Sequence, residues 1–204
     1  LVSANPSHIQ YANLSGGESP MIEIRWHGRG GQGAVTSVEM LALAAIEAGK
    51  YAQGFPAFGP ERRGAPVMAF NRLSDKPIKI RSGIYRPDVV VVLDPSLVSL
   101  VPVTDGLKPD GTLIVNTSKT AAEIRKALNY KGKLVTVDAT HIAREELGVP
   151  IANTTMLGAV LKATGVLKMD SMKSPLEHRF GRVAGKNMSA MKRAYNEAKP
   201  AKAA

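Results

Sequence analysis

The chain has 204 residues, and its content of 44% hydrophobic and 22% charged residues is typical of a soluble globular fold rather than a disordered chain. It contains no cysteine, which excludes disulfides, thiolate zinc sites, a cysteine nucleophile and any iron–sulfur cluster held by this chain alone. The formal net charge of +10 is uneven, because residues 1–161 contain 17 basic and 14 acidic residues, whereas residues 162–204 contain 10 basic and 3 acidic ones.

Composition also argues against two kinds of surface. Aromatic residues make up only 5% of the chain, so a nucleic-acid surface built on base stacking is not expected. No apolar run approaches the roughly 20 residues that a membrane-spanning helix needs. The cationic C-terminal segment could favour nucleic acid, an anionic membrane or an acidic protein, but composition alone favours a solvated, lysine-rich helix face.

The first 20 residues do not resemble part of a fold. They show no alternating or helical pattern, and the stretch from Ser15 to Pro20 is linker-like. Met21 then opens the first strong strand. We expect residues 1–20 to be a disordered leader that is not native. They lack the features of a secretory signal, so a cytoplasmic location is expected.

Alternation and β-branched runs predict strands, and helical spacing predicts the helices between them. The run Val89–Leu93 suits a strand covered on both faces of a parallel sheet. A hairpin is predicted between residues 67–73 and 78–80, with the polar turn 74–77. The other predicted strands are 22–26, 112–115 and 134–137, and the predicted helices are 34–48, 120–128 and 138–146. This order indicates an α/β fold with a Rossmann-like doubly wound sheet and an antiparallel hairpin insertion.

The C-terminal part has a different character. Helices are predicted at 156–163, 175–180 and 186–198, and they suggest a helical C-terminal arm that begins near residue 153. We therefore expect one domain over residues 21–198. Residues 199–204 are expected to be a frayed tail.

A glycine-rich loop follows the first strand and is the sharpest motif. It matches G-x-G-x-x-G, and its residues are Gly28, Arg29, Gly30, Gly31, Gln32 and Gly33. Backbone N–H groups at such a helix N-terminus can bind an anion, and Arg29 adds a cation. A dinucleotide site would also need an acidic residue about 20 positions on, and residues 51–56 offer none. A tight strand-to-helix crossover that binds nothing is the other interpretation.

A second charged loop spans residues 58–66. Arg62 and Arg63 could bind a phosphate, while Glu61 could hold the loop in shape, with Gly64 as a turn former. A surface turn with a local ion pair of little energetic value explains the same residues. Residue chemistry alone leaves these alternatives open.

No catalytic residue and no metal site is predicted. His27, His141 and His178 stand at no metal-ligand spacing with carboxylates, and no serine lies in a G-x-S-x-G elbow. Asp94 and Asp138 end predicted parallel strands, where aspartates often cap the next helix. Such a chain could not by itself carry out a redox reaction.

Four stretches of the chain resemble the gamma subunit of 2-oxoacid:ferredoxin oxidoreductases, especially those that act on pyruvate. They are residues 24–33, residues 58–66, residues 87–91 and residues 153–159, the last of which begins with Asn153. The resemblance covers residues 21–198. It implies a complex that oxidatively decarboxylates a 2-oxoacid, transfers the acyl group to coenzyme A and reduces ferredoxin.

The resemblance also implies where the cofactors lie. No cofactor is expected on this chain, whereas thiamine diphosphate, magnesium and iron–sulfur clusters would belong to companion alpha, beta and delta subunits. Residues 60–66 favour pyruvate, with branched-chain 2-oxoacids or 2-oxoglutarate as alternatives. Glu61, Gly64 and Asn153 are candidates for shaping loops or for an interface. The isolated subunit could form a homodimer through an exposed apolar patch.

The two loops together suggest a ligand site. If both lie at the carboxyl edge of the sheet, then Arg29, Arg62 and Arg63 would surround one electropositive hollow. We hypothesise that this hollow holds the phosphate end of coenzyme A. The alternatives are that the arginines pair with carboxylates of a companion subunit, or that the chain is a stand-alone nucleotide- or nucleic-acid-binding module.

Overall fold

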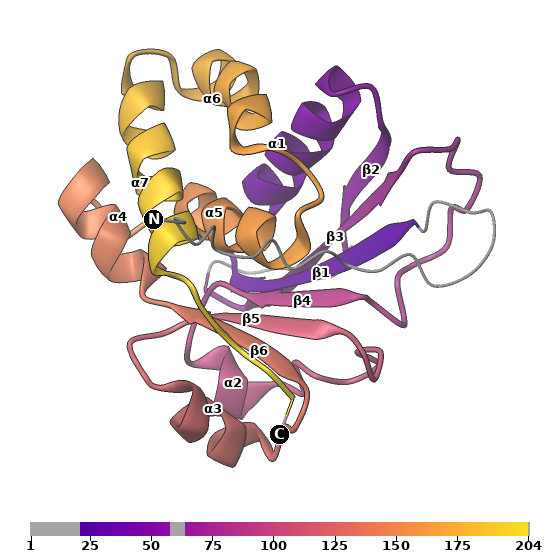
Figure 1. Cartoon of the computed structure of the whole chain (residues 1–204), viewed down its shortest axis with the longest axis vertical. Helices are drawn as coiled ribbons and strands as arrows, with labels where there is room; N and C mark the ends of the chain where they lie inside the picture. Colours follow the sequence, from indigo (N-terminus) through magenta and orange to yellow (C-terminus); the bar gives the residue numbers. More distant parts are fainter. Residues whose placement is uncertain (1–20, 58–63, 204) are drawn as a thin grey trace, which may run out of the picture.

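A computed structural model describes residues 21–57 and 64–203. The described residues form one seven-stranded mixed sheet in the order β2-β3-β1-β4-β5-β6-β7. Figure 1 shows α1 and α4 to α7 above this sheet, and α2 and α3 below it. The expected α/β fold with a doubly wound sheet and helices on both faces is therefore confirmed.

Four parallel strands form the centre of the sheet. They are β1 (Ile22–Arg29), β4 (Val89–Val92), β5 (Thr112–Asn116) and β6 (Lys133–Val137). All four valines of β4 are buried, as expected for a strand that is covered on both faces. The glycine loop follows β1 and therefore lies at the carboxyl edge of these strands.

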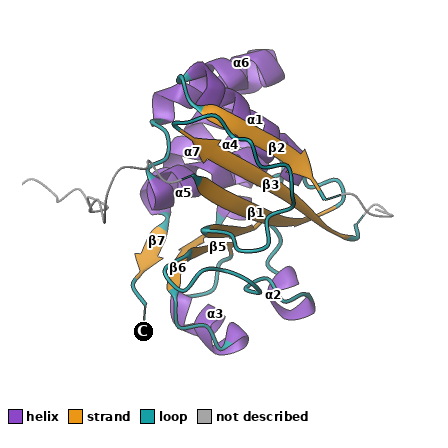
Figure 2. Cartoon of the chain, turned by 90° about the vertical axis from the view of Figure 1, so that its right-hand side faces the viewer, coloured by secondary structure: helices purple, strands orange, loops and turns teal. Residues whose placement is uncertain are grey.

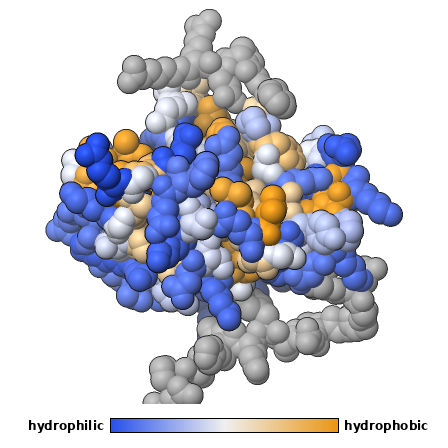
Figure 3. Space-filling model, turned by 90° about the horizontal axis from the view of Figure 1, so that it is seen from above, coloured by the Kyte–Doolittle hydropathy of each residue, from blue (hydrophilic) through white to orange (hydrophobic). Residues whose placement is uncertain are grey.

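The upper helical layer holds the larger of two hydrophobic cores. Ile24 and Trp26 of β1 point into it and are fully buried. The helices are α1 (Ala34–Glu47), α4 (Ala139–Leu147), α5 (Asn153–Thr164), α6 (Lys173–Phe180) and α7 (Ala184–Glu197), and two short 3₁₀ turns span Met169–Met172 and Gly181–Val183. From above, the described surface is mostly hydrophilic, with separate hydrophobic residues between (Figure 3).

The lower layer is thinner and covers only part of the sheet. The helices α2 (Leu97–Leu100) and α3 (Ala121–Leu128) pack against β4, β5 and β6 around the second core. Thr120 and Glu123 form a capping box at the start of α3. Loops instead of helices lie over β1 and β3 on this face, where teal segments are seen in Figure 2.

The antiparallel hairpin is present, but its strands differ from those expected. It consists of β2 (Tyr51–Pro56) and β3 (Pro66–Ser74), and β3 also pairs with β1. The prediction that residues 78–80 form the partner strand is wrong, because this segment contains no strand. Its alternating pattern arises in a loop that Arg72 holds against the sheet, through a bond from Nη2 to the Gly83 carbonyl at 3.2 Å.

The predicted helical C-terminal region is confirmed, since α5, α6 and α7 correspond to the three predicted helices. Nine residues of α5, Asn153–Leu161, are buried, several of them in the larger core, so this helix is an integral part of the domain. The predicted frayed tail contains β7 (Lys199–Ala201), which pairs antiparallel with β6. Arg125 also contacts the Lys202 carbonyl next to this strand.

Candidate functional site at the carboxyl edge

The glycine loop connects β1 to α1 in a conformation that requires glycine. Gly31 and Gly33 have φ angles of +94° and +81°, which side chains rarely tolerate. A Cβ atom on Gly33 would lie 2.3 Å from Nδ2 of Asn153, so the loop also packs closely against the start of α5. The predicted strand–loop–helix arrangement is therefore present, with α5 as a third partner.

Several N–H groups of this loop already have partners within the protein. The Arg29 N–H donates to Oε1 of Gln32 at 2.8 Å, and the Gln32 N–H donates to the Arg29 carbonyl at 2.9 Å. The Gly30 N–H donates to the Ala65 carbonyl at 2.9 Å. An anion would have to displace these bonds, so the loop does not present the open row of donors that binds a dinucleotide pyrophosphate.

The Arg29 side chain connects three elements. Its Nε lies 3.2 Å from Oδ2 of Asp94, its Nη1 donates to the Gly64 carbonyl at 2.9 Å, and its Nη2 donates to Oγ of Ser96 at 2.8 Å. The side chain is 27% exposed. Because Asp94 neutralises its charge, Arg29 is better suited to hold neighbouring loops than to attract a ligand alone.

Asp94 accepts bonds at both carboxylate oxygens. Oδ1 accepts from the Ser96 N–H at 2.9 Å and from the Ser96 hydroxyl at 2.5 Å, and Oδ2 accepts from Nε2 of Gln32 at 2.6 Å. Burial opposes ionisation, but the bonds from Ser96 and Gln32 and the charge of Arg29 outweigh it, so the pKa of Asp94 is lowered. We call Arg29, Gln32, Asp94 and Ser96 the Asp94 cluster.

The expectation that the two loops lie side by side is met by the described end of the second loop. The Gly64 N–H donates to the Gly30 carbonyl at 3.1 Å, in addition to the bond from Gly30 to Ala65. Glu61, Arg62 and Arg63 lie outside the described residues. The structure thus places Gly64, where the described part of this loop begins, beside the glycine loop.

Asn153, a candidate for shaping a loop or an interface, lies buried where α1 and α5 meet. Its Oδ1 accepts from the Thr154 N–H at 2.8 Å, and its carbonyl accepts from the Ser37 hydroxyl at 3.1 Å. The Thr154 hydroxyl donates in turn to Oδ1 of Asn187 on α7 at 2.7 Å. Asn153 therefore helps to position the glycine loop against the helical layer.

Three further residues considered in the sequence analysis have places that the fold explains: Trp26 and His27 are buried, and Asp138 caps a helix. Trp26 is buried in the larger core, and its Nε1 donates to Oδ1 of Asn71 at 2.9 Å. His27 is 6% exposed, and burial followed by the charge of Arg25 lowers the pKa of its imidazole to about 4. Nε2 of His27 has no hydrogen-bond partner among the described residues. Asp138 accepts from the His141 N–H at 3.0 Å and caps α4, as strand-end aspartates often do.

The sequence drew attention to Asp94 but not to its place beside the glycine loop. Since β1 and β4 are parallel neighbours, their carboxyl ends must meet, and this rule could have linked Asp94 to Arg29. Ser96 carried no such signal. It contributes through its position two residues after Asp94, where its N–H and hydroxyl reach the same carboxylate oxygen.

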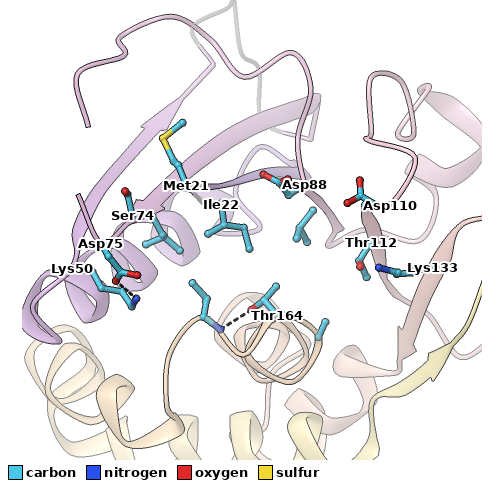
Figure 4. A pocket seen from close by; sticks show the side chains of 15 residues that line it. Met21, Ile22, Lys50, Ser74, Asp75, Asp88, Asp110, Thr112, Lys133 and Thr164 are labelled. Carbon is cyan, nitrogen blue, oxygen red and sulfur yellow. Dashed lines mark hydrogen bonds and ion pairs between the residues drawn. The ribbon is translucent and has the colours of Figure 1, made fainter. Parts of the chain in front are cut away.

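A cavity of about 450 Å³ opens at the opposite, amino edge of the parallel strands. Figure 4 shows charged and hydroxyl side chains around it, including Asp88, Asp110, Thr112 and Thr164. Lys50 and Asp75 pair at its rim, and Asp88 pairs with a lysine outside it, Lys108, at 2.7 Å. The cavity shares no residue with the Asp94 cluster.

Residues 21–57 and 64–203 contain neither a candidate metal site nor a helix that could cross a membrane. No three histidine, cysteine, aspartate or glutamate side chains in these ranges are grouped so that they could hold a metal ion. Every helix in them is too short or too polar to span a bilayer.

Comparison with known proteins gives consistent matches over most of the chain. The family model described as pyruvate ferredoxin/flavodoxin oxidoreductase matches residues 23–197. The pyruvate/ketoisovalerate oxidoreductases common subunit gamma of Thermococcus kodakarensis is 58% identical over 179 residues, which cover 87% of this chain and 97% of that protein. The pyruvate synthase subunit PorC of Methanothermobacter marburgensis is 52% identical over 180 residues, which cover 88% of this chain and 98% of that one.

A solved structure agrees with these relatives. The crystal structure of pyruvate oxidoreductase subunit PORC from Thermotoga maritima superposes with a TM-score of 0.81 at 44% identity, and the match covers 89% of this chain and 99% of that chain. Both the sequence and the fold are therefore shared over nearly the full length of these relatives. The chain belongs to the pyruvate ferredoxin/flavodoxin oxidoreductase family, as a subunit of the gamma type.

Proposed function

We propose that this chain, a gamma subunit of a 2-oxoacid:ferredoxin oxidoreductase, works in a complex that converts pyruvate, coenzyme A and oxidised ferredoxin to acetyl-CoA, carbon dioxide and reduced ferredoxin. Thiamine diphosphate, magnesium and the iron–sulfur clusters would reside on companion alpha, beta and delta subunits. The absence of cysteine from the chain supports this division, because thiolates are the usual ligands of such clusters.

The choice of 2-oxoacid would be made by other subunits. The Thermococcus kodakarensis relative is named as the common gamma subunit of a pyruvate and a ketoisovalerate oxidoreductase. A subunit that serves two such enzymes cannot by itself distinguish their substrates. We therefore keep branched-chain 2-oxoacids as the first alternative substrate and 2-oxoglutarate as the second.

The alternative of a stand-alone nucleotide- or nucleic-acid-binding module finds no support. Three of the N–H groups around the glycine loop are bonded within the protein, those of Arg29, Gly30 and Gln32. Two relatives at more than 50% identity are named as subunits, one of pyruvate/ketoisovalerate oxidoreductases and one of pyruvate synthase. The loop is better explained as a junction between elements.

We further propose that Arg62 and Arg63 hold the phosphate end of coenzyme A. The observation that carries this proposal is the position of Gly64, which accepts from Arg29 and donates to Gly30, while the Asp94 cluster holds Arg29. Gly64 lies at the carboxyl edge beside the glycine loop, and arginine side chains bind phosphate through charge-assisted, often bidentate hydrogen bonds. Arg29 itself serves as the brace, since Asp94 already neutralises it.

The test is the double substitution Arg62→Gln/Arg63→Gln in the complete complex. If the arginines contact phosphate, the complex stays intact, the KM for coenzyme A rises and the KM for pyruvate is unchanged. Each lost charged contact costs about 1.5–3 kcal/mol, or roughly tenfold or more in kcat/KM for coenzyme A. The matched control is Lys126→Gln/Lys131→Gln, which removes two exposed cations from α3 and the loop after it.

Two results would contradict the coenzyme A proposal. If the substituted subunit no longer co-purifies with its partners while the control does, the arginines fix the assembly. If the complex forms and both KM values equal those of the control, the arginines contact neither coenzyme A nor a companion subunit.

A further inference from the structure

The long loop between β3 and β4, residues 75–88, has a defined path although it contains no helix or strand. It leads from the end of β3 to the start of β4, and both strands are labelled in Figure 1. Nε2 of Gln53 donates to the Ile80 carbonyl at 3.1 Å, and Nη2 of Arg72 donates to the Gly83 carbonyl at 3.2 Å. Ile84 is only 4% exposed and anchors the loop through its side chain.

Arg72 makes this attachment rigid. Its side chain is 1% exposed, and its Nε lies 2.8 Å from Oε1 of Glu23, while Nη1 donates to Oε1 of Gln53 at 3.3 Å. Its guanidinium carbon lies 5.6 Å from the centre of the Phe55 ring. A buried cation with this many partners is costly to move, so the loop carbonyl that it binds is held firmly.

The outer side of the loop exposes side chains that the fold does not use. Tyr85 is 78% exposed and Ile80 is 47% exposed. Lys79, Arg81 and Arg86 are also exposed, and no carboxylate in the described part of the chain forms a salt bridge with any of the three.

The acidic residues at the two ends of the loop are already engaged. Asp75 pairs with Lys50, and Asp88 pairs with Lys108. The loop therefore combines an exposed aromatic ring, an exposed aliphatic side chain and three cations whose charge no nearby described carboxylate balances. Tyrosine and arginine are the residues most enriched among those that dominate protein–protein binding energy.

We propose that residues 79–86 form a docking surface for an acidic face of a companion subunit. Lys79, Arg81 and Arg86 meet carboxylates on that face, and Tyr85 and Ile80 fill its apolar centre. Because Arg72 and Ile84 hold the loop before binding, docking costs little conformational entropy. The proposal rests on the chain being a subunit of a complex, and it is independent of whether Arg62 and Arg63 bind coenzyme A.

This surface lies apart from the glycine loop. The loop of residues 75–88 begins where β3 ends and returns to the start of β4, next to the amino end of β1. The Asp94 cluster lies at the carboxyl ends of the same strands. The subunit would therefore contact the complex at the amino edge, whether or not the carboxyl edge faces coenzyme A.

A protein partner fits this surface better than a nucleic acid. Single-stranded nucleic acids bind to several aromatic rings in a positively charged groove, whereas Tyr85 is the only aromatic side chain in residues 75–88. Lys79 and Arg81 flank Ile80 in the sequence, and Arg86 follows Tyr85, so acidic side chains on a protein partner would meet cations beside both apolar side chains.

The test is reconstitution of the complex from this chain and its companion subunits, with the dissociation constant measured over a range of salt concentrations. Tyr85→Ala should weaken assembly about tenfold, as expected for an exposed tyrosine at an interface centre. Arg81→Glu/Arg86→Glu should weaken it by more and should reduce its dependence on salt. The matched control, Lys126→Glu/Lys131→Glu, makes the same change in net charge elsewhere and should assemble normally.

Circular dichroism and thermal unfolding of each variant show whether it folds, and Tyr85→Ala keeps the test valid if the charge reversal does not. Folded Tyr85→Ala and Arg81→Glu/Arg86→Glu variants that assemble with unchanged affinity would overturn the proposal. So would unchanged assembly together with loop-dependent binding of the isolated chain to a single-stranded oligonucleotide. A raised KM for coenzyme A in a normally assembled Arg62→Gln/Arg63→Gln complex would support the coenzyme A proposal and would not bear on this docking surface.

Discussion

Replacing Asp94 by asparagine tests whether the Asp94 cluster holds the carboxyl edge together. The two carboxylate oxygens accept from the Ser96 N–H and hydroxyl, from Gln32 and, as an ion pair, from Arg29. An asparagine has one carbonyl oxygen and one NH₂ group, and the NH₂ group would face donors in either orientation. At least one pair of these donors must therefore lose its acceptor.

The size of the effect follows from which bonds are lost. A hydrogen bond to a charged group contributes about 1.5–3 kcal/mol, and partial exposure of the cluster lets water replace part of it. We expect Asp94→Asn to lower the free energy of unfolding by about 2–4 kcal/mol. Because the fold lowers the pKa of Asp94 below its ordinary 3.8, this stabilisation is present above that pH and is lost on acidification.

Urea denaturation at neutral pH measures this difference directly. The matched control is Asp110→Asn, because Asp110 is an exposed aspartate at the opposite edge and has no salt bridge among the described residues. The control should change the free energy of unfolding by no more than about 0.5 kcal/mol. If Asp94→Asn lowers the free energy of unfolding no more than the control does, the carboxylate does not hold the two loops together. The position of Gly64 beside the glycine loop would then have another cause.

Two other residues give sharp predictions. The pKa of His27 is lowered from 6.5 to about 4, so its contribution to the free energy of unfolding should be complete above pH 6.5 and should fall by about 3 kcal/mol as the pH falls to 4. Unfolding curves at several pH values should show a smaller loss for His27→Gln. Equal losses for the variant and the unchanged protein would refute this assignment. Gly33→Ala should cost about 2 kcal/mol or more, because φ is +81° and Asn153 occupies the space for a Cβ atom. Gly185→Ala, in α7 with nothing within 4 Å of its Cβ position, should instead stabilise the fold by about 0.5–1 kcal/mol, and a loss similar to that of Gly33→Ala would contradict this interpretation.

The sequence predicted the centre of the fold well because that centre is encoded locally. The valine run of β4 and the alternation in β1 identify buried strands without knowledge of their neighbours. Thr120 and Glu123 fix the start of α3 through a capping box, which involves only residues within one helical turn.

Elements that depend on distant partners were less predictable. Ile78 and Ile80 alternate with cations as in a strand, but β2 occupies the place beside β3 and leaves them in a loop. Strand β7 has only three residues and no hydrophobic alternation, so pairing with β6 defines it.

The candidate site also has one part that the local sequence predicts and another that depends on distant segments. The glycine loop could be predicted from its spacing, whereas its partners Asp94, Ser96 and Gly64 come from three other segments. Only the strand order brings these segments together. The sequence therefore indicated where the edge lies, but not that Asp94 and Ser96 contact Arg29 there.

Both edges of the seven-stranded sheet contain a proline: Pro56 in β2 and Pro200 in β7. Proline has no N–H group, so neither edge can supply a full row of donors to a strand from another molecule. Lys199 adds a charge beside Pro200 on the shorter edge. Extension of the sheet by a strand from another molecule is therefore disfavoured at both edges, and contacts made through side chains are favoured instead.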